Sequence, residues 1–178
     1  GLKPSSGMLD GDHSQGALPT YTAMDYAIEM AKKTGIAAVG VTNSSHFGPA
    51  GAYTLYAAKK NMIALAFCNS DSFVRLYDGA ERFHGTNPIS MAVPTGGSNP
   101  WLFDMATSSV PFNRVELYRS LNQKLPSDVA SDVSGNSTED PHIAEMLDPL
   151  GAKFGFKGAG LGGVSEILSA VLTGMKLS

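Results

Sequence analysis

Two short apolar runs in the first half of the chain each end in a cluster of polar residues. Residues 36–41 lead into Asn43-Ser44-Ser45-His46, and residues 62–67 lead into Asn69-Ser70-Asp71-Ser72. Apolar runs of this length, bounded by turn-forming residues, are typical of buried strands, and residues 51–61 between them show a helical pattern. Strand, helix and strand at this spacing predict a crossover between two parallel strands. Both polar clusters are therefore expected at the same edge of one sheet.

The flanking segments predict further helices and strands. Residues 19–33 carry apolar positions at helical spacing, and Gly35 stands where a helix commonly ends. Residues 1–17 predict a turn-rich opening segment. Strands are expected at 89–93 and 101–103, a helix at 112–124, an irregular loop at 126–141 and a buried helix at 161–172. The pattern predicts an α/β fold with a mixed sheet flanked by helices, as one domain over residues 1–178.

Composition narrows the class of protein. The 178 residues are 43% hydrophobic and 16% charged, which is globular but poor in charge, so some surface is expected to be covered by further protein. The net charge of −3, with scattered Lys and Arg, offers no basic face for nucleic acid. No apolar run approaches the roughly 20 residues of a membrane span. The single cysteine, Cys68, excludes an internal disulfide framework, suits a reducing compartment such as the cytoplasm, and is interpreted as a small buried filler.

His46 is the first candidate for chemistry. Open α/β sheets bind ligands outside the carboxyl ends of their strands, which is where the sequence places this imidazole. Imidazole exchanges protons near neutral pH more readily than other side chains. The alternative is that His46 only caps a turn. The second polar cluster at the same expected edge favours a site.

Three other motifs are weaker. The spacing Gly158-x-Gly160-x-x-Gly163 matches a dinucleotide fingerprint, but no strand precedes it, so a Rossmann fold is rejected. Glycines beside Lys157 at a helix start could instead form an anion cradle. A hydrolase that uses Ser70 stays an alternative, although the Gly-x-Ser-x-Gly elbow is absent. The four histidines show no metal-ligand spacing, so no metal site is expected.

Seven segments, taken in order, cover essentially the whole chain and resemble the malate/L-lactate dehydrogenase-like family of oxidoreductases, which is distinct from the Rossmann lactate and malate dehydrogenases. The family also includes ureidoglycolate and sulfolactate dehydrogenases. The segments are Leu9-Asp10-Gly11-Asp12, Asn43-Ser44-Ser45-His46-Phe47-Gly48, Asn69-Ser70-Asp71, Gly85-Thr86-Asn87-Pro88, Phe103-Asp104-Met105-Ala106-Thr107-Ser108, Thr138-Glu139-Asp140-Pro141 and Phe156-Lys157-Gly158-Ala159-Gly160-Leu161.

This resemblance implies hydride transfer between NAD or NADP and a small 2-hydroxy acid or 2-oxo acid, such as malate or lactate. It implies that His46 is the proton donor and acceptor and that Asp71 is a nearby acid of the site. The residues implied in cofactor binding are Ser70, Asp104, Met105, Ala106, Phe156, Lys157 and Gly158. Those expected to line the substrate cleft are Asn43, Thr86 and Asn87.

The chain also departs from the family pattern. Family members are longer at both ends and carry a Ser-His-Gly segment with a second histidine. In some members, that histidine is given the acid/base role. We therefore expect residues 1–178 to be a central fragment that lacks substrate-binding helices and a C-terminal part. The resemblance further implies a homodimer. A non-catalytic or incomplete cofactor-binding domain stays open as an alternative.

Overall fold

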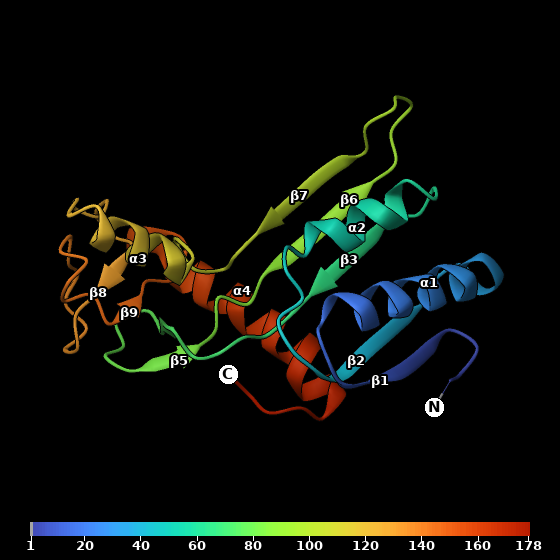
Figure 1. Cartoon of the computed structure of the whole chain (residues 1–178), viewed down its shortest axis with the longest axis horizontal. Coiled ribbons are helices and arrows are strands. Elements are labelled where there is room, and N and C mark those ends of the chain that lie inside the picture. The colour runs from blue at the N-terminus through green and yellow to red at the C-terminus, as the bar shows by residue number, and fades with distance from the viewer. Residues whose placement is uncertain (1) are drawn as a thin grey trace. The chain divides into compact units, whose positions relative to one another are not determined.

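The computed structural model describes residues 2–178, which form a mixed α/β fold (Figure 1). Contacts divide them into two compact units. Unit 1 comprises the described residues up to Phe67, Ile89–Met105 and Leu168–Lys176. Unit 2 comprises Cys68–Pro88, Ala106–Ile167 and Leu177–Ser178. The sequence pattern predicts one domain over residues 1–178.

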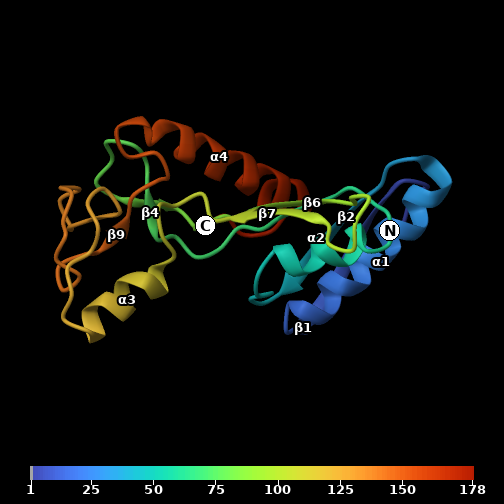
Figure 2. The ribbon, with the colours of Figure 1, turned by 90° about the horizontal axis from the view of Figure 1, so that it is seen from above.

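Unit 1 contains a parallel strand pair and a three-stranded antiparallel sheet. Strands β1 (Ser6–Ser14) and β2 (Ala38–Ser44) run parallel, joined by helix α1 (Ala17–Thr34). The second sheet has the order β3-β6-β7, with β3 (Ala64–Phe67), β6 (Ile89–Val93) and β7 (Trp101–Met105), and helix α2 (Gly51–Ala58) packs on it. Figure 2 shows α1 and α2 on the same side of these strands, where Ile28, Ala57 and Ala64 form a buried core.

Unit 2 is built around a small four-stranded sheet of order β5-β4-β9-β8. Its core joins Val74, Val115, Leu125 and Leu147, and α3 contributes Val115. The elements are β4 (Val74–Arg75), β5 (Arg82–His84), α3 (Phe112–Ser120), β8 (Ala130–Ser131), β9 (Met146–Leu147), the 3₁₀ turn η1 (Ala152–Phe154) and helix α4 (Phe156–Glu166). A π-helical turn, η2 (Ile167–Val171), follows α4 in the chain, and its residues from Leu168 onward belong to unit 1.

The local helix and strand predictions are largely confirmed. Helix α1 ends at Gly35. The N–H of Gly35 donates to the carbonyl oxygen of Ala31, and the φ angle of Gly35 is 86°. Alanine in that left-handed conformation would be strained, which is why glycine suits this position. Strands β2, β3, β6 and β7 and helices α2 and α3 lie within the predicted segments, apart from shifts of a few residues at their ends.

Three predictions about the fold are wrong. The opening segment, which was predicted to be turn-rich, contains β1. The alternation of apolar and polar residues does not reveal this strand, because among the described strands it pairs only with β2 and most of its residues are exposed. Strands β2 and β3 do not pair with each other, so the parallel crossover is β1–α1–β2. The last helix begins at Phe156 and is not buried along its length, since Leu168 and Leu172 are 41% and 69% exposed.

Candidate functional site

His46 lies two residues beyond the carboxyl end of β2, in the loop that leads to α2, and its side chain is exposed. Two glycines allow neighbouring backbone to approach this loop. A Cβ atom on Gly16 would lie 2.1 Å from the carbonyl oxygen of Ser45, and one on Gly11 would lie 2.9 Å from that of Asn43. Contacts this short are not sterically possible, so β1 and the start of α1 hold the loop only because these residues are glycine.

The side chain of Asp10 links β1 to β2 near the carboxyl ends of these strands. Its Oδ1 accepts the backbone N–H of Asp12 at 3.0 Å and the side-chain Nδ2 of Asn43 at 3.2 Å. Asp12 and Asn43 have φ angles of 50° and 49°, in the left-handed region that Asn and Asp tolerate better than most residues. The N–H of Asp12, followed by the amide of Asn43, lowers the pKa of the Asp10 carboxyl group. Asn43 thus faces Asp10 rather than projecting freely from the strand end.

Asp104 anchors the other end of the His46 loop. Its Oδ2 accepts the N–H of Gly51, the first residue of α2, at 2.8 Å. A carboxylate at this position interacts favourably with the positive end of the helix dipole. The hydroxyl group of Tyr53 donates to the carbonyl oxygen of Phe47, which fixes the backbone beside His46. Met105 completes β7 after Asp104 and is half-buried.

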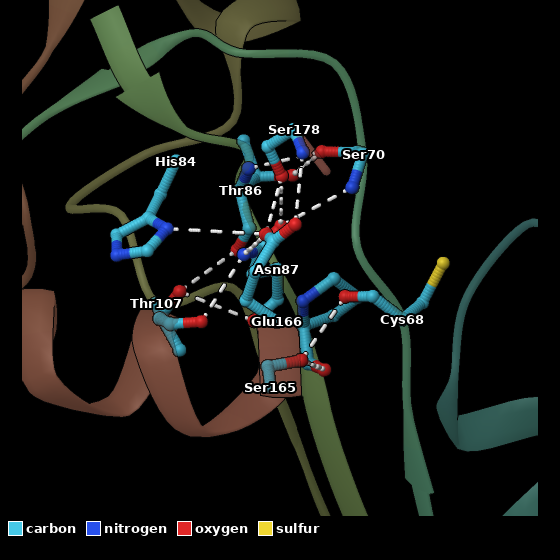
Figure 3. Close-up of polar contacts among 11 residues, drawn as sticks. Cys68, Ser70, His84, Thr86, Asn87, Thr107, Ser165, Glu166 and Ser178 are labelled. Atoms are coloured by element: carbon cyan, nitrogen blue, oxygen red, sulfur yellow. Dashed lines mark hydrogen bonds and ion pairs between the residues drawn. The ribbon is translucent and has the colours of Figure 1, made fainter. Parts of the chain in front are cut away.

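In unit 2, Ser70, Thr86 and Asn87 lie together (Figure 3). The N–H of Ser70 donates to Oδ1 of Asn87 at 3.1 Å, and the N–H of Thr86 donates to the hydroxyl oxygen of Ser70 at 3.0 Å. Thr107, next to Ala106, donates its N–H to the carbonyl oxygen of Thr86 at 2.9 Å. The structure therefore brings three of the predicted segments together. Asp71 follows Ser70 and is exposed.

Asn87 is fully buried, so its side chain contacts protein rather than solvent. Its Nδ2 donates to Glu166 at 2.7 Å and to the carbonyl oxygen of Gly162 at 3.1 Å. Glu166 is also beside His84, with 3.8 Å between His84 Nδ1 and the carboxylate. Burial lowers the pKa of His84, while the charge of Glu166 opposes that shift. Sequence reasoning missed Glu166 as a site residue. The sequence did carry a signal for Glu166, which is the only charged residue in the apolar helix predicted over residues 161–172.

Phe156 and Lys157 start α4 and are exposed beside other aromatic rings. The ring centroid of Phe156 lies 6.0 Å from that of Tyr77 and 6.4 Å from that of Phe154, and the Lys157 ammonium lies 5.3 Å from the Phe154 centroid. Gly158 is buried inside α4, and its N–H donates to the carbonyl oxygen of Leu150 at 3.1 Å. The glycines are thus part of the helix rather than a flexible cradle before it.

The predicted site residues divide between the two units. Unit 1 holds Asn43, His46, Asp104 and Met105, and unit 2 holds Ser70, Asp71, Thr86, Asn87, Ala106, Phe156, Lys157 and Gly158. Among residues 2–178, no group of three or more His, Cys, Asp or Glu is arranged to hold a metal ion. The described helices include none that is both long and apolar enough to cross a membrane.

Cys68, which precedes this cluster, is half-buried, and its thiol donates to the carbonyl oxygen of Asn69 at 2.9 Å. Burial, followed by the charge of Glu166, raises the pKa of the Cys68 thiol from 9.0 to about 11. Because the thiolate is the reactive form, we expect iodoacetamide at pH 8 to alkylate folded Cys68 about a hundredfold more slowly than the urea-unfolded chain. Mass spectrometry of the Cys68 peptide measures both rates, and equal rates would contradict a buried, protonated thiol.

The comparisons with known proteins agree on one family. A family model described as malate/L-lactate dehydrogenase matches residues 2–178. The malate dehydrogenase of Pyrococcus abyssi is 44% identical, with 96% of this chain and 49% of that protein covered. The NAD(+) ureidoglycolate dehydrogenase of Escherichia coli is 35% identical, with 97% and 48% covered. The chain therefore spans about half the length of the curated relatives it matches.

A solved structure supports the same assignment. The crystal structure of malate dehydrogenase from Entamoeba histolytica matches with a TM-score of 0.93 and 33% sequence identity, over 99% of this chain and 52% of that one. The predicted α/β class is confirmed by this match. With both the sequence and the fold in agreement over nearly all described residues, the chain belongs to the malate/L-lactate dehydrogenase family.

Proposed function

We propose that the full-length protein is an NAD- or NADP-dependent dehydrogenase that interconverts a small 2-hydroxy acid and the corresponding 2-oxo acid. The observation that carries this proposal is an exposed imidazole, His46, held at the carboxyl edge of a parallel strand pair in a chain of this family. Malate is one candidate substrate, since malate dehydrogenases are among the relatives that the chain matches.

His46 is proposed to move the proton of the reaction. When bound, the nicotinamide group would supply or accept the hydride at the carbon that carries the substrate oxygen, and the proton is left to the protein. In oxidation, the neutral imidazole takes the hydroxyl proton as the carbonyl forms. In reduction, the imidazolium returns that proton to the oxygen, where negative charge would otherwise build up. Asp71 is proposed as a further acid of the site, because it follows Ser70 and is exposed.

The residues at the start of α4 have the chemistry that a dinucleotide needs. Flat bases stack on aromatic rings, and phosphates pair with ammonium groups. Phe156 and Lys157 are both exposed, and Tyr77 and Phe154 lie beside Phe156. We propose that Phe156 and Lys157 contact the cofactor, with Ser70 and the segment 104–106 as further contacts. Gly158 would contribute through close packing, because its N–H is already bonded to Leu150.

Thr86, Asn43 and Asn87 were expected to line the substrate cleft. Thr86 is half-buried and keeps a hydroxyl group next to that of Ser70, at 3.3 Å, so it is proposed to face the ligand. Asn43 faces Asp10, and Asn87 is buried, so a supporting role fits both better than direct substrate contact.

We further propose that the full-length protein is a cytoplasmic homodimer. The low proportion of charged residues supports covered surface, and the single cysteine suits a reducing compartment. The hydrolase alternative is not favoured. The hydroxyl group of Ser70 is bonded to the N–H and hydroxyl of Thr86, neither of which can act as the general base that a serine nucleophile requires. A non-catalytic domain is the alternative that experiment must exclude.

The direct test is to assay the full-length protein with NADH and NADPH against a panel of 2-oxo acids that includes oxaloacetate and pyruvate. We expect substrate-dependent loss of reduced-nicotinamide absorbance with at least one acid. Titration of the protein alone, followed by nicotinamide fluorescence, reports binding without turnover. Binding without turnover on any acid would favour the non-catalytic alternative, and a folded protein that binds neither cofactor would overturn the proposal.

A further inference from the structure

Glu166 is a carboxylate that is only 6% exposed and that no role yet explains. Its two oxygens accept hydrogen bonds from the side-chain Nδ2 of Asn87 at 2.7 Å, the N–H of Ser178 at 2.8 Å and the hydroxyl of Ser178. Figure 3 shows the carboxylate and the Asn87 amide pointing toward one another. Burying a charge is costly unless it is well bonded, and these donors satisfy both oxygens.

Asn87 connects this carboxylate to Ser70. With Nδ2 directed at Glu166 and at the carbonyl oxygen of Gly162, the other end of the amide, Oδ1, accepts the N–H of Ser70 at 3.1 Å. The amide has only this orientation available, because a carboxylate and a carbonyl can accept but cannot donate. Glu166, together with the carbonyl oxygen of Gly162, therefore determines which atom of Asn87 is presented to Ser70.

The consequence reaches the hydroxyl group of Ser70. Once its backbone is fixed by Asn87, the hydroxyl oxygen accepts the N–H of Thr86 at 3.0 Å and keeps one proton that it can donate. Gly85 makes this approach possible, since a Cβ there would lie 2.3 Å from the same oxygen. Ser70 is thus held at its backbone N–H by Asn87 and at its hydroxyl group by Thr86.

We infer that Glu166 and Asn87 are positioning residues that orient Ser70 for the nicotinamide cofactor, through a fixed donor-to-acceptor order from Ser70 to Asn87 to Glu166. This inference rests on the proposed function. It assigns a role in cofactor binding to two buried side chains that do not themselves contact the cofactor. The fixed order makes the inference testable, because it can be reversed by isosteric substitutions.

The test compares Asn87→Asp, Glu166→Gln and the double variant in the full-length protein. Asn87→Asp sets two carboxylates against each other and turns an acceptor toward Gly162. Glu166→Gln keeps the shape but leaves one of its donors without an acceptor. We expect cofactor Kd, measured by nicotinamide fluorescence, to rise about tenfold or more for Asn87→Asp and about threefold for Glu166→Gln. In the double variant, the introduced glutamine amide can donate to the introduced aspartate carboxylate, so the Kd should return part of the way to that of the parent, because the aspartate oxygen still faces the carbonyl oxygen of Gly162.

Ser165→Ala is the matched control. Ser165 lies next to Glu166 on α4, is buried, and donates to the backbone carbonyl oxygens of Cys68 and Pro88. Removing its hydroxyl should lower thermal stability but leave cofactor Kd within about twofold, because the bond to the N–H of Ser70 is untouched. The inference is overturned if the control weakens binding as much as Asn87→Asp does, or if the double variant binds no better than Asn87→Asp.

Hydrogen exchange at the amide of Ser70 gives a readout that does not depend on the cofactor. We expect faster exchange in Asn87→Asp, partial recovery in the double variant, and parent-like exchange in Ser165→Ala. Unchanged exchange in Asn87→Asp would overturn the inference even where the parent binds cofactor. A parent that binds neither NADH nor NADPH overturns the proposed function and the cofactor role together, while the exchange pattern still reports whether the three residues are coupled.

Discussion

Replacing His46 by alanine in the full-length protein is expected to lower kcat by about 10² to 10⁴, which is the usual contribution of a general acid–base group. The Kd for the reduced cofactor should change by no more than about twofold, because an imidazole that moves a substrate proton makes no contact the cofactor requires. Folding should be preserved, since the side chain is exposed and its loop is held by other residues, namely Gly16, Tyr53 and Asp104. Steady-state kinetics and nicotinamide fluorescence measure the two quantities separately.

His142→Ala is the matched control for that substitution. His142 is also exposed, and its hydrogen bond to Asp140 uses its backbone N–H, which alanine retains. Its kcat should therefore equal that of the parent. If His46→Ala turns over substrate at the parental rate, His46 is not the acid/base and its assignment is overturned. If His46→Ala loses cofactor affinity as strongly as turnover, its role is in binding rather than in proton transfer.

The sequence predicted those elements whose pattern is set locally. Helix α1 follows from apolar residues at helical spacing and from Gly35, which can adopt the left-handed conformation that ends the helix. Strand β6 was predicted with its observed bounds, because a short, mostly apolar run that begins with Ile89 and ends with Val93 lies between two turn-forming segments. In these cases the residues that decide the structure are close together in the chain.

The features that the sequence did not predict depend on contacts between residues that are distant in the chain. Nothing near β2 indicates that it pairs with β1 rather than β3, because its partners in β1, such as Leu9 opposite Val41, are distant in the chain. The bond between Asn87 and Glu166 joins residues 79 positions apart, and although Glu166 stands out as a lone charge in an apolar helix, nothing near it in the sequence indicates that Asn87 is its partner. The family resemblance assigns both Ser70 and Thr86 to the site, and the structure joins them through hydrogen bonds of 3.1 Å to the Asn87 amide and 3.0 Å from the Thr86 N–H.

The glycines of α4 show how spacing alone misleads. Gly158-x-Gly160-x-x-Gly163 matches a phosphate-binding loop, yet all three glycines lie inside the helix. Gly158 is there because α4 crosses the backbone of Leu150 at very short range. A Cβ atom on Gly158 would lie 2.3 Å from the carbonyl oxygen of Leu150 and 2.4 Å from its nitrogen. Leu150 cannot easily retreat, since its N–H is bonded to the carbonyl oxygen of Thr107 at 3.0 Å.

Alanine substitutions at Gly158 and Gly160 are therefore expected to change stability in opposite directions. Gly158→Ala should lower the free energy of unfolding by about 3 kcal/mol, because overpacking against backbone forces the helix to move. Gly160→Ala should raise it by up to about 1 kcal/mol, because alanine favours a helix over glycine. Apart from its chain neighbours and the nearby backbone of α4, no atom of the described residues lies within 4 Å of the Cβ position there. Urea unfolding of the two full-length variants beside the parent measures both changes.

The sign of the two changes separates packing from phosphate binding. If the glycines serve to bring backbone close to a phosphate, both alanine variants should weaken cofactor binding and neither should change the stability of the cofactor-free protein much. If they serve helix packing, only Gly158→Ala should be harmful, and its loss of stability should appear without any cofactor present. Equal and small changes in stability at both positions would contradict the close contact between α4 and Leu150, and with it the support that this contact gives to Thr107 beside Thr86 and Asn87.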